Sequence, residues 1–288
     1  MTPSPSDASA NPDQLRVLFA TPECSPLIKT GGLADVSAAL PAALIALGVH
    51  ARILLPGYRQ VLAQLPHCRE IARLAPMAEL PAARLLLGQT GAGVPLIVLD
   101  CPELYDRGGG PYQTEAGSDW PDNALRFGLL SRVAALLGSA ASPLAWRPQV
   151  LHCNEWQTAL APAYLRYAAG ASAATLLTIH NLAFQGIFDP GLVAALDLPA
   201  DCFSPEGVEY YGKLSFLKAG LQLAGAITTV SPGYANEIQH EPLGFGLHGL
   251  LSARKDRLYG ILNGIDTGVW NPATDPLISC RYDAGTLA

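Results

Sequence analysis

The sequence is poor in charge and has no long apolar run. Only 15% of its 288 residues are charged, and the formal net charge is -6. A general nucleic-acid binder would carry a basic face, so no nucleic-acid partner is expected. Every apolar run is broken by Pro, Gly or charge before it reaches the roughly 18 residues of a membrane span, so no membrane partner is expected either.

The six cysteines form no C-x-x-C pair, and residues 1–14 contain no arginine and no apolar run. The cysteine spacing therefore predicts no metal site. The first 14 residues are rich in Ser, Pro, Ala and Asp, which predicts a disordered tail rather than an export signal. We expect a cytoplasmic protein with reduced cysteines and no cofactor.

Half of the residues are hydrophobic, and strand-length apolar runs alternate with helix-period runs. The apolar runs are mostly continuous, as in a sheet that is covered on both faces. This rhythm predicts an α/β fold with a doubly wound, mainly parallel, Rossmann-like sheet, and residues 64–94 could add a small antiparallel excursion. The expected strands are residues 15–21, 51–56, 95–100, 149–154, 175–181, 226–231 and 258–263, and the expected helices are residues 33–47, 122–137, 156–169, 210–223 and 232–239.

A Lys-Thr-Gly-Gly stretch at residues 29–32 lies between the first expected strand and the first expected helix. Gly31 and Gly32 let backbone N–H groups come close to a ligand. A helix N-terminus favours an anion, and Lys29 adds a full positive charge to the same loop. The loop is therefore predicted to bind a phosphate or a sugar diphosphate, although a Gly-Gly pair at a helix start is also compatible with a plain turn.

Polar and aromatic residues follow the other expected strands. Ligands of such sheets bind at the carboxyl ends of the strands, so these residues are predicted to share one rim with Lys29. Amides and hydroxyls can bond the hydroxyls of a sugar, and aromatic rings can stack on its faces, which indicates a carbohydrate ligand. The rim residues are Tyr105, Arg107, Asn154, Glu155, Trp156, Gln157, His180, Asn181 and Gln185.

Eight motifs resemble, in order and spacing, those of the bacterial glycogen synthase and starch synthase family. The resemblance covers nearly the whole chain from Val17 onward. The motifs are residues 29–36, 104–107, 152–158, 178–186, 216–220, 229–232, 249–251 and 262–266.

The resemblance implies a retaining glucosyltransferase with the two-Rossmann-domain (GT-B) fold. It would transfer glucose from ADP-glucose to the non-reducing end of an α-1,4-glucan, such as glycogen or a maltooligosaccharide, without metal. Carried over residue by residue, the resemblance makes His180 catalytic. It makes Lys29, Gly31, Gly32 and Asn181 donor-binding, and Tyr105, Asn154, Glu155, Trp156 and Gln157 acceptor-binding.

The family also has a second Rossmann domain after its Asn-Gly-Ile-Asp segment, which this chain carries at residues 263–266. We therefore expect residues 15–270 to be the N-terminal, acceptor-side domain and residues 271–288 to begin the interdomain linker. Without the second domain the cleft could not close, so the isolated chain is expected to have negligible transferase activity.

Plainer interpretations of single residues stay open at this point. His180 could cap a strand, and Trp156 could anchor its helix in the core. Asp35 could be a favourable first-turn acid, and Glu23 a carboxylate at the surface or at the edge of the core. The alternative functions are a GT-B glycosyltransferase with another nucleotide-sugar and a non-catalytic glucan-binding module.

Overall fold

The computed structural model describes residues 14–168, 170 and 172–286. The tail predicted at residues 1–14 lies outside the described residues, apart from Gln14. The last residue of the helix predicted at residues 156–169 also lies outside them.

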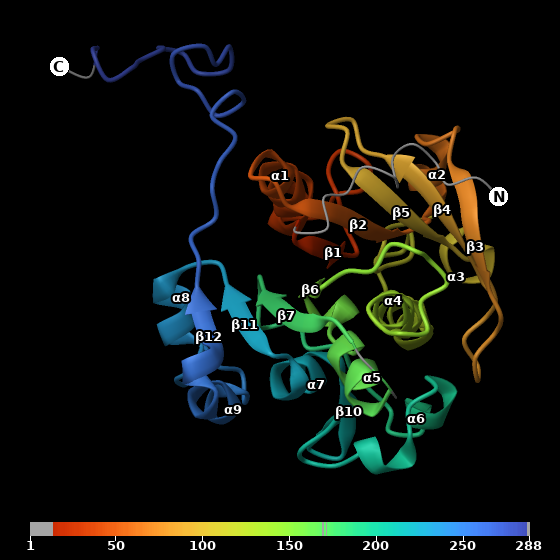
Figure 1. Cartoon of the computed structure of the whole chain (residues 1–288). Coiled ribbons are helices and arrows are strands. Elements are labelled where there is room, and N and C mark those ends of the chain that lie inside the picture. The colour runs from red at the N-terminus through yellow and green to blue at the C-terminus, as the bar shows by residue number, and fades with distance from the viewer. Residues whose placement is uncertain (1–13, 169, 171, 287–288) are drawn as a thin grey trace.

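A nine-stranded sheet forms the centre of the molecule (Figure 1). Apolar, fully buried residues fill most of its inner strands, as expected for strands with both faces covered. From one edge to the other, the strands are β12 (Leu258–Gly260), β11 (Ala226–Thr229), β7 (Ala174–Ile179), β6 (Val150–Asn154), β1 (Arg16–Ala20), β2 (His50–Pro56), β5 (Pro95–Asp100), β4 (Ala83–Gln89) and β3 (Arg69–Leu74).

The strands from β12 through β5 are parallel to one another. Only β4 and β3 run antiparallel to their neighbours, at one edge of the sheet. This arrangement confirms the predicted α/β fold with a doubly wound, mainly parallel sheet. The antiparallel addition predicted at residues 64–94 is confirmed too, because it supplies these two edge strands.

Helices cover both faces of the sheet. Crossovers between parallel strands are right-handed, so two crossovers that run in opposite directions along the sheet place their helices on opposite faces. The crossover from β1 to β2 uses α1 (Gly32–Ala46), and the crossover from β5 to β6 runs the other way along the sheet and uses α4 (Asn123–Leu137). These two helices therefore lie on opposite faces (Figure 1). No helix in the described part of the chain has the length and hydropathy that a membrane span needs. The other helices are α2 (Arg59–Ala63), α3 (Pro102–Tyr105), α5 (Ala161–Tyr167), α6 (Leu192–Ala195), α7 (Phe216–Leu223), α8 (Pro232–Glu237) and α9 (His248–Ala253).

The direction of winding reverses between β1 and β6, which are neighbours in the sheet. In open parallel sheets, a crevice opens at such a switch point, outside the carboxyl ends of the strands. The loop after β1 contains Lys29, and the turn after β6 contains Glu155. The topology thus brings two of the predicted motifs to the place where ligands bind in this class of fold.

The helix predicted at residues 210–223 is wrong in its first part, where the chain forms a second, three-stranded sheet. Tyr211 and Gly212 have φ of 48° and 76°, a left-handed conformation that a helix interior does not tolerate. The helix starts only after Ser215, whose Oγ accepts a hydrogen bond from the backbone N–H of Lys218 at 3.2 Å. The strands of the second sheet are β8 (Ile187–Phe188), β9 (Glu209–Tyr210) and β10 (Lys213–Ser215).

The helix predicted at residues 156–169 is divided in two. A 3₁₀ turn covers Trp156–Thr158, and α5 begins only at Ala161. Pro162 stands in the first turn of α5, where the absence of an N–H group does no harm. A single amphipathic pattern therefore continues across two short elements.

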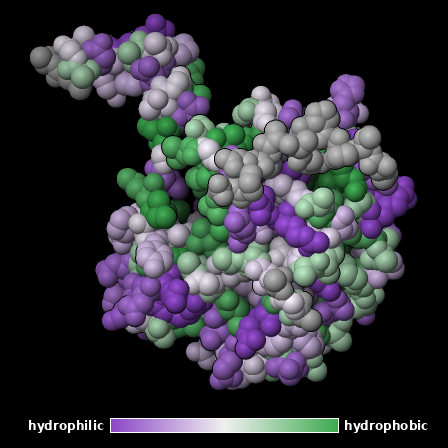
Figure 2. Space-filling view, in the orientation of Figure 1, coloured by the Kyte–Doolittle hydropathy of each residue, from purple (hydrophilic) through white to green (hydrophobic). Residues whose placement is uncertain are grey.

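The chain leaves the sheet after β12 as an exposed segment without helix or strand through residue 286 (Figure 1). The start of this segment carries exposed apolar side chains, among them Ile261, Leu262 and Ile265. Figure 2 shows apolar surface on the part of this segment that is nearest the main body of the molecule. The domain boundary expected at residue 270 stays a prediction.

Two helical glycines give opposite predictions for substitution by alanine. A Cβ at Gly220 in α7 would lie 2.8 Å from the carbonyl oxygen of Ala159 and 2.8 Å from Leu177, whereas a Cβ at Gly249 in α9 would meet nothing within 4 Å. Gly220→Ala should therefore lower the free energy of unfolding by about 1–3 kcal/mol through overpacking. Gly249→Ala, the matched control, should raise it by about 0.5–1 kcal/mol. Urea unfolding measures both, and a Gly220→Ala protein as stable as the parent would contradict the packing described here.

Candidate functional site

The Lys-Thr-Gly-Gly loop connects β1 to α1 at the switch point of the sheet. Gly31 is the N-cap of α1, in extended conformation and without a side-chain cap. A Cβ built on Gly31 or Gly32 would meet nothing within 4 Å, so this side of the loop is open. The first N–H groups of α1 have no intrahelical acceptor, which leaves them available to an anion.

Lys29 forms an exposed ion pair with Asp35, in the first turn of α1. Its Nζ lies 2.7 Å from the carboxylate, and the two side chains are 50% and 57% exposed. Such an ion pair contributes little to stability, about 0–1 kcal/mol. Lys29 can therefore exchange Asp35 for another anion at small cost.

Glu23, 3% exposed, holds the same loop from beneath. Its carboxylate accepts hydrogen bonds from the Thr30 N–H at 2.5 Å, the Thr30 hydroxyl at 2.6 Å and the Gly31 N–H at 3.4 Å. The hydroxyl of Tyr112 donates a further hydrogen bond to it. Two of the backbone N–H groups expected to face a phosphate are thus bound to a carboxylate of the protein.

Glu155 holds the loop that follows β7 in the same way. Its Oε1 accepts hydrogen bonds from the backbone N–H groups of His180 and, at 2.7 Å, of Asn181. Burial raises the pKa of Glu155 to about 7, although these N–H groups act in the opposite direction. Glu155 has φ of 63° and ψ of 177°, a region that costs a residue other than glycine on the order of 1–3 kcal/mol. The strained turn aims the carboxylate at the neighbouring strand end.

His180 follows β7 and is half-buried. Its Nε2 lies 3.1 Å from Oδ1 of Asn154, and the Nδ2 of Asn154 donates to the carbonyl of Ala20 at 3.1 Å. The amide is therefore oriented with its oxygen towards His180, so Nε2 carries the proton. Burial lowers the pKa of His180 to about 4, which keeps the imidazole neutral at pH 7 and leaves Nδ1 as an acceptor.

The five residues predicted on the acceptor side are all buried. Trp156 packs edge-on against Phe127 and Phe216, with ring centroids 5.0 and 6.1 Å apart, which corresponds to the core-anchor interpretation. Tyr105 lies apart from the others, and its hydroxyl donates to the carbonyl of Arg126 at 2.6 Å. Their exposed fractions are 9% or less for Tyr105, Asn154, Glu155, Trp156 and Gln157.

The structure thus separates the predicted site residues into two groups. Lys29, Gly31, Gly32 and Asn181 are exposed, and His180 is half-buried behind them. The residues predicted on the acceptor side are buried. The side chains of Tyr105, Asn154 and Glu155 bond backbone groups, and Trp156 packs in the core.

Sequence reasoning missed three residues of this network, namely Glu23 as a holder of the loop, Tyr112 as its partner, and the buried Arg126. Glu23 stands directly after the first strand, which was the available signal. Tyr112 is 89 residues further along the chain, so no local pattern connects the two.

No group of three or more His, Cys, Asp or Glu residues within the described part of the chain is arranged to hold a metal ion. The six cysteines, all of which are described, are free thiols. Burial raises the pKa of Cys24, beside the Lys29 loop, to about 12, so this thiol stays protonated and unreactive.

The fold and the switch-point site define the class of this protein. The family model of the starch synthase catalytic domain matches residues 16–253, and the chain belongs to this family. The predicted resemblance is thereby confirmed.

Individual relatives are identical to this chain at more than half of the matched residues. The chain is 58% identical over 281 residues to the glycogen synthase of Aromatoleum aromaticum, covering 98% of the chain and 57% of that protein. It is 56% identical over 290 residues to the glycogen synthase of Nitrosomonas europaea, covering 99% of the chain and 58% of that protein. The chain therefore spans somewhat more than half the length of the curated relatives it matches.

A solved structure shares the fold. The catalytic domain of starch synthase IV from Arabidopsis thaliana, bound to ADP and acarbose, matches with a TM-score of 0.77 and 28% identity. The match covers 95% of this chain and 56% of that one.

The hydrogen bonds of Glu23 predict that a substitution at this residue lowers the free energy of unfolding. Glu23→Gln leaves one acceptor oxygen and turns an NH₂ group towards N–H donors, so it should lower the free energy of unfolding by about 1–3 kcal/mol. Asp35→Asn, which removes only the exposed ion pair, is the control and should cost less than about 1 kcal/mol. Urea unfolding measures both, and equal effects of the two substitutions would refute the role of Glu23.

The buried titratable groups predict the pH dependence of stability. Burial lowers the pKa of His152 to about 3 and that of His180 to about 4, from the usual 6.5. The folded protein therefore binds fewer protons than the unfolded chain between these values, and both groups lower the free energy of unfolding as the pH falls from 6.5. Glu155, whose pKa rises from 4.5 to about 7, acts in the opposite direction: its contribution is full below pH 4.5 and is lost as the pH rises to about 7. With two groups against one, the free energy of unfolding should fall on acidification from pH 6.5 towards 4.5.

Variants separate these contributions. His180→Asn should flatten the dependence of the unfolding free energy on pH by up to about 1.4 kcal/mol per pH unit, and Glu155→Gln should steepen it by a similar amount. Urea unfolding between pH 4.5 and 7 is the measurement. The same change of slope in both variants would show that the two groups do not titrate as described.

Proposed function

We propose that this chain carries the donor loop and the acceptor side of a glycogen synthase. The reaction transfers glucose from ADP-glucose to the non-reducing end of an α-1,4-glucan, with retention of configuration. The observation that carries the proposal is that Asn154, at the end of β6, bonds both the end of β1 and His180, so that the residues after these three strands meet at one edge of the sheet. The similar plant starch synthase, whose solved structure is bound to ADP and acarbose, supports the same two ligand classes.

On the donor side, Lys29 exchanges Asp35 for the diphosphate of ADP-glucose. Gly31 and Gly32 leave the space that the diphosphate needs, and the first N–H groups of α1 face its negative charge. In a closed cleft with little water, the attraction between Lys29 and the diphosphate is much stronger than that of the exposed ion pair. This stabilises the leaving group without a metal or other cofactor in the proposed reaction.

At the glucosyl group, neutral His180 is the catalytic residue, with Asn181 beside it. The free Nδ1 of His180 can accept a hydrogen bond from a sugar hydroxyl, which orients the ring for attack. The acceptor hydroxyl attacks from the face that the diphosphate leaves, and the departing phosphate takes its proton. The chain's own contribution is therefore positioning and charge stabilisation.

Two carboxylates would offer a different route to retention, through a glycosyl-enzyme intermediate. The Glu155 carboxylate is buried and bound to loop N–H groups, and Asp35 is paired with Lys29. Neither is presented as a free nucleophile, which favours the same-face route.

The buried residues Tyr105, Asn154, Glu155, Trp156 and Gln157 support the acceptor side from within. We assign them to positioning: Glu155 fixes the loop at His180, and Trp156 fixes the turn after β6 in the core. In this proposal, the glucan is contacted directly by exposed backbone and side chains that cover these buried residues.

We assign the rest of the active site to the part of the relatives that these 288 residues do not cover. The proposal includes a second Rossmann domain that completes the cleft and a cytoplasmic location, for which the free cysteines are the supporting observation. The isolated chain should accordingly show negligible transfer of glucose.

Calorimetry with ADP-glucose and with a maltooligosaccharide tests the binding part of the proposal. Lys29→Ala should weaken ADP-glucose binding by about tenfold or more, because a charge-assisted hydrogen bond is lost, and should leave maltooligosaccharide binding unchanged. Lys255→Ala, at an exposed position beyond α9, is the control and should change neither. Maltooligosaccharide binding without any ADP-glucose binding would favour a glucan-binding module over a synthase.

The activity part is tested by incorporation of radiolabelled glucose from ADP-glucose into glycogen. The 288-residue chain alone should give incorporation near background. Turnover comparable to that of a full-length relative would contradict the need for a second domain.

A further inference from the structure

A pocket of about 270 Å³ lies beside the Lys29 loop, between α2, α3 and the glycine-rich segment 108–110. Its wall includes Ile28, Tyr58, Arg59, Tyr105, Arg107 and Arg126. This volume is at the small end of the range for ligand sites and suits a compact ligand. Three arginines in one small pocket make its charge balance the first question.

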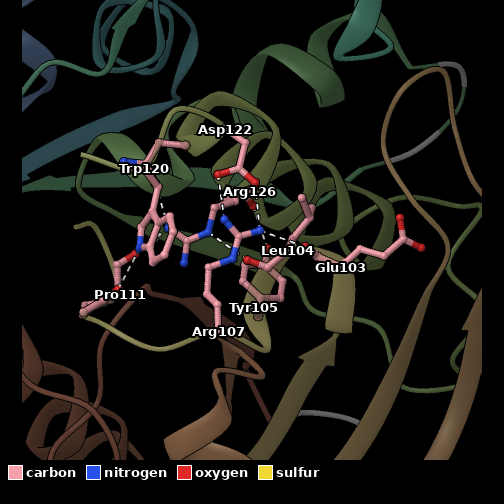
Figure 3. Close-up of polar contacts among 10 residues, drawn as sticks. Glu103, Leu104, Tyr105, Arg107, Pro111, Trp120, Asp122 and Arg126 are labelled. Carbon is pink, nitrogen blue, oxygen red and sulfur yellow. Dashed lines mark hydrogen bonds and ion pairs between the residues drawn. The ribbon is translucent and has the colours of Figure 1, made fainter. Parts of the chain in front are cut away.

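Arg126 is 0% exposed, and neutral groups account for its contacts (Figure 3). Its Nε donates to the carbonyl of Leu104 at 2.9 Å. Its Nη1 donates to the carbonyl of Pro111 at 2.8 Å and to Oδ1 of Asn123 at 2.7 Å. These bonds fasten the chain around α3 and the glycine-rich segment to α4, which explains two of the three guanidinium nitrogens.

The third nitrogen, Nη2, is buried and has no hydrogen-bond partner among the described residues. The hydroxyl of Tyr58, in the same pocket wall, is the second such atom. Burial raises the pKa of Tyr58, so its hydroxyl keeps its proton and can donate. Two unused donors, one of them charged, therefore lie in the wall of one pocket, beneath its surface, and a ligand reaches them when the neighbouring wall side chains shift.

The carboxylates nearby are committed to other partners. Asp122 binds Arg107 through both oxygens at 2.9 Å, as Figure 3 shows, and Asp106 binds Arg59 at 2.7 Å. No ion pair within the described residues involves Arg126. A buried charge without a direct ion pair is costly, and the Asp122 carboxylate, which acts on Arg126 from a longer distance, and the surrounding aromatic rings compensate for it only in part.

We propose that this pocket is a second, anion-binding site, in which Arg126 Nη2 and Tyr58 Oη donate to the phosphate group of a small phosphate compound. Arg59 and Arg107 at its wall are each paired with an aspartate, so Arg126 is the source of the pocket's net positive charge, which favours an anion. The ligand is either free inorganic phosphate or a phosphate ester of a single sugar, since a guanidinium and a hydroxyl recognise the same group in both. A buried water could bond both donors as well, but it would not add a negative charge next to Arg126.

Calorimetry on the whole 288-residue chain tests the proposal with inorganic phosphate, glucose 1-phosphate and, as an uncharged control, glucose. Both phosphate compounds should bind, and glucose should not. Tighter binding of inorganic phosphate identifies a free-ion site, and tighter binding of glucose 1-phosphate identifies a sugar-ester site. Saturating ADP should leave the binding unchanged, whereas competition by ADP would mean that the anion occupies the donor site and would overturn the proposal.

Two variants locate the ligand. Tyr58→Phe removes only the hydroxyl and should weaken phosphate binding by about tenfold, and Arg126→Lys, which loses the free Nη2, should weaken it at least as much. Arg132→Lys, further along α4 and paired with Asp197, is the matched control and should bind phosphate as the parent does. If Arg126→Lys fails to fold, Tyr58→Phe still decides. Phosphate binding that Tyr58→Phe leaves intact, or no binding of any phosphate compound, would refute the site and leave a buried water as the occupant.

Discussion

Two buried carboxylates hold the loops on which the rest of the site depends. Glu23 accepts hydrogen bonds from the backbone of Thr30 and Gly31, and Glu155 accepts them from the backbone of His180 and Asn181. A carboxylate taken out of water is costly unless it is hydrogen-bonded, so each loop must keep its shape for its carboxylate to stay satisfied. The carboxylates and the loops thus stabilise one another.

This constraint explains how the exposed groups keep their positions. The Lys29 side chain is only lightly held, by an exposed ion pair, but the backbone beneath it is fixed by Glu23. His180 is fixed twice, through its backbone by Glu155 and through its ring by Asn154. Groups held in this way need little reorganisation when a ligand binds.

Much of the fold could be predicted from local pattern, because continuous apolar runs and helix-period runs report burial directly. The prediction failed where a few backbone angles decided the outcome: the left-handed turn at Tyr211 and Gly212 placed a β-hairpin where an apolar helix was expected. The exposed loop at residues 29–32 was also predictable, since its glycines, lysine and helix start are adjacent in sequence. The Glu23–Tyr112 bond and the burial of Tyr105 were not, because they depend on segments that meet only in the folded sheet.

The sequence by itself determined the fold class, the family and the composition of the loop at residues 29–32, because each is encoded by neighbouring residues or by a fixed order of motifs. Only the tertiary structure decided which side chains are exposed and which are buried and bind the backbone of a loop. Glu23 and Glu155 have no local mark that tells a surface acid from a buried one. Their roles follow from the strand order, which places β1 beside β6 and β6 beside β7, and so brings each carboxylate within hydrogen-bond distance of a loop.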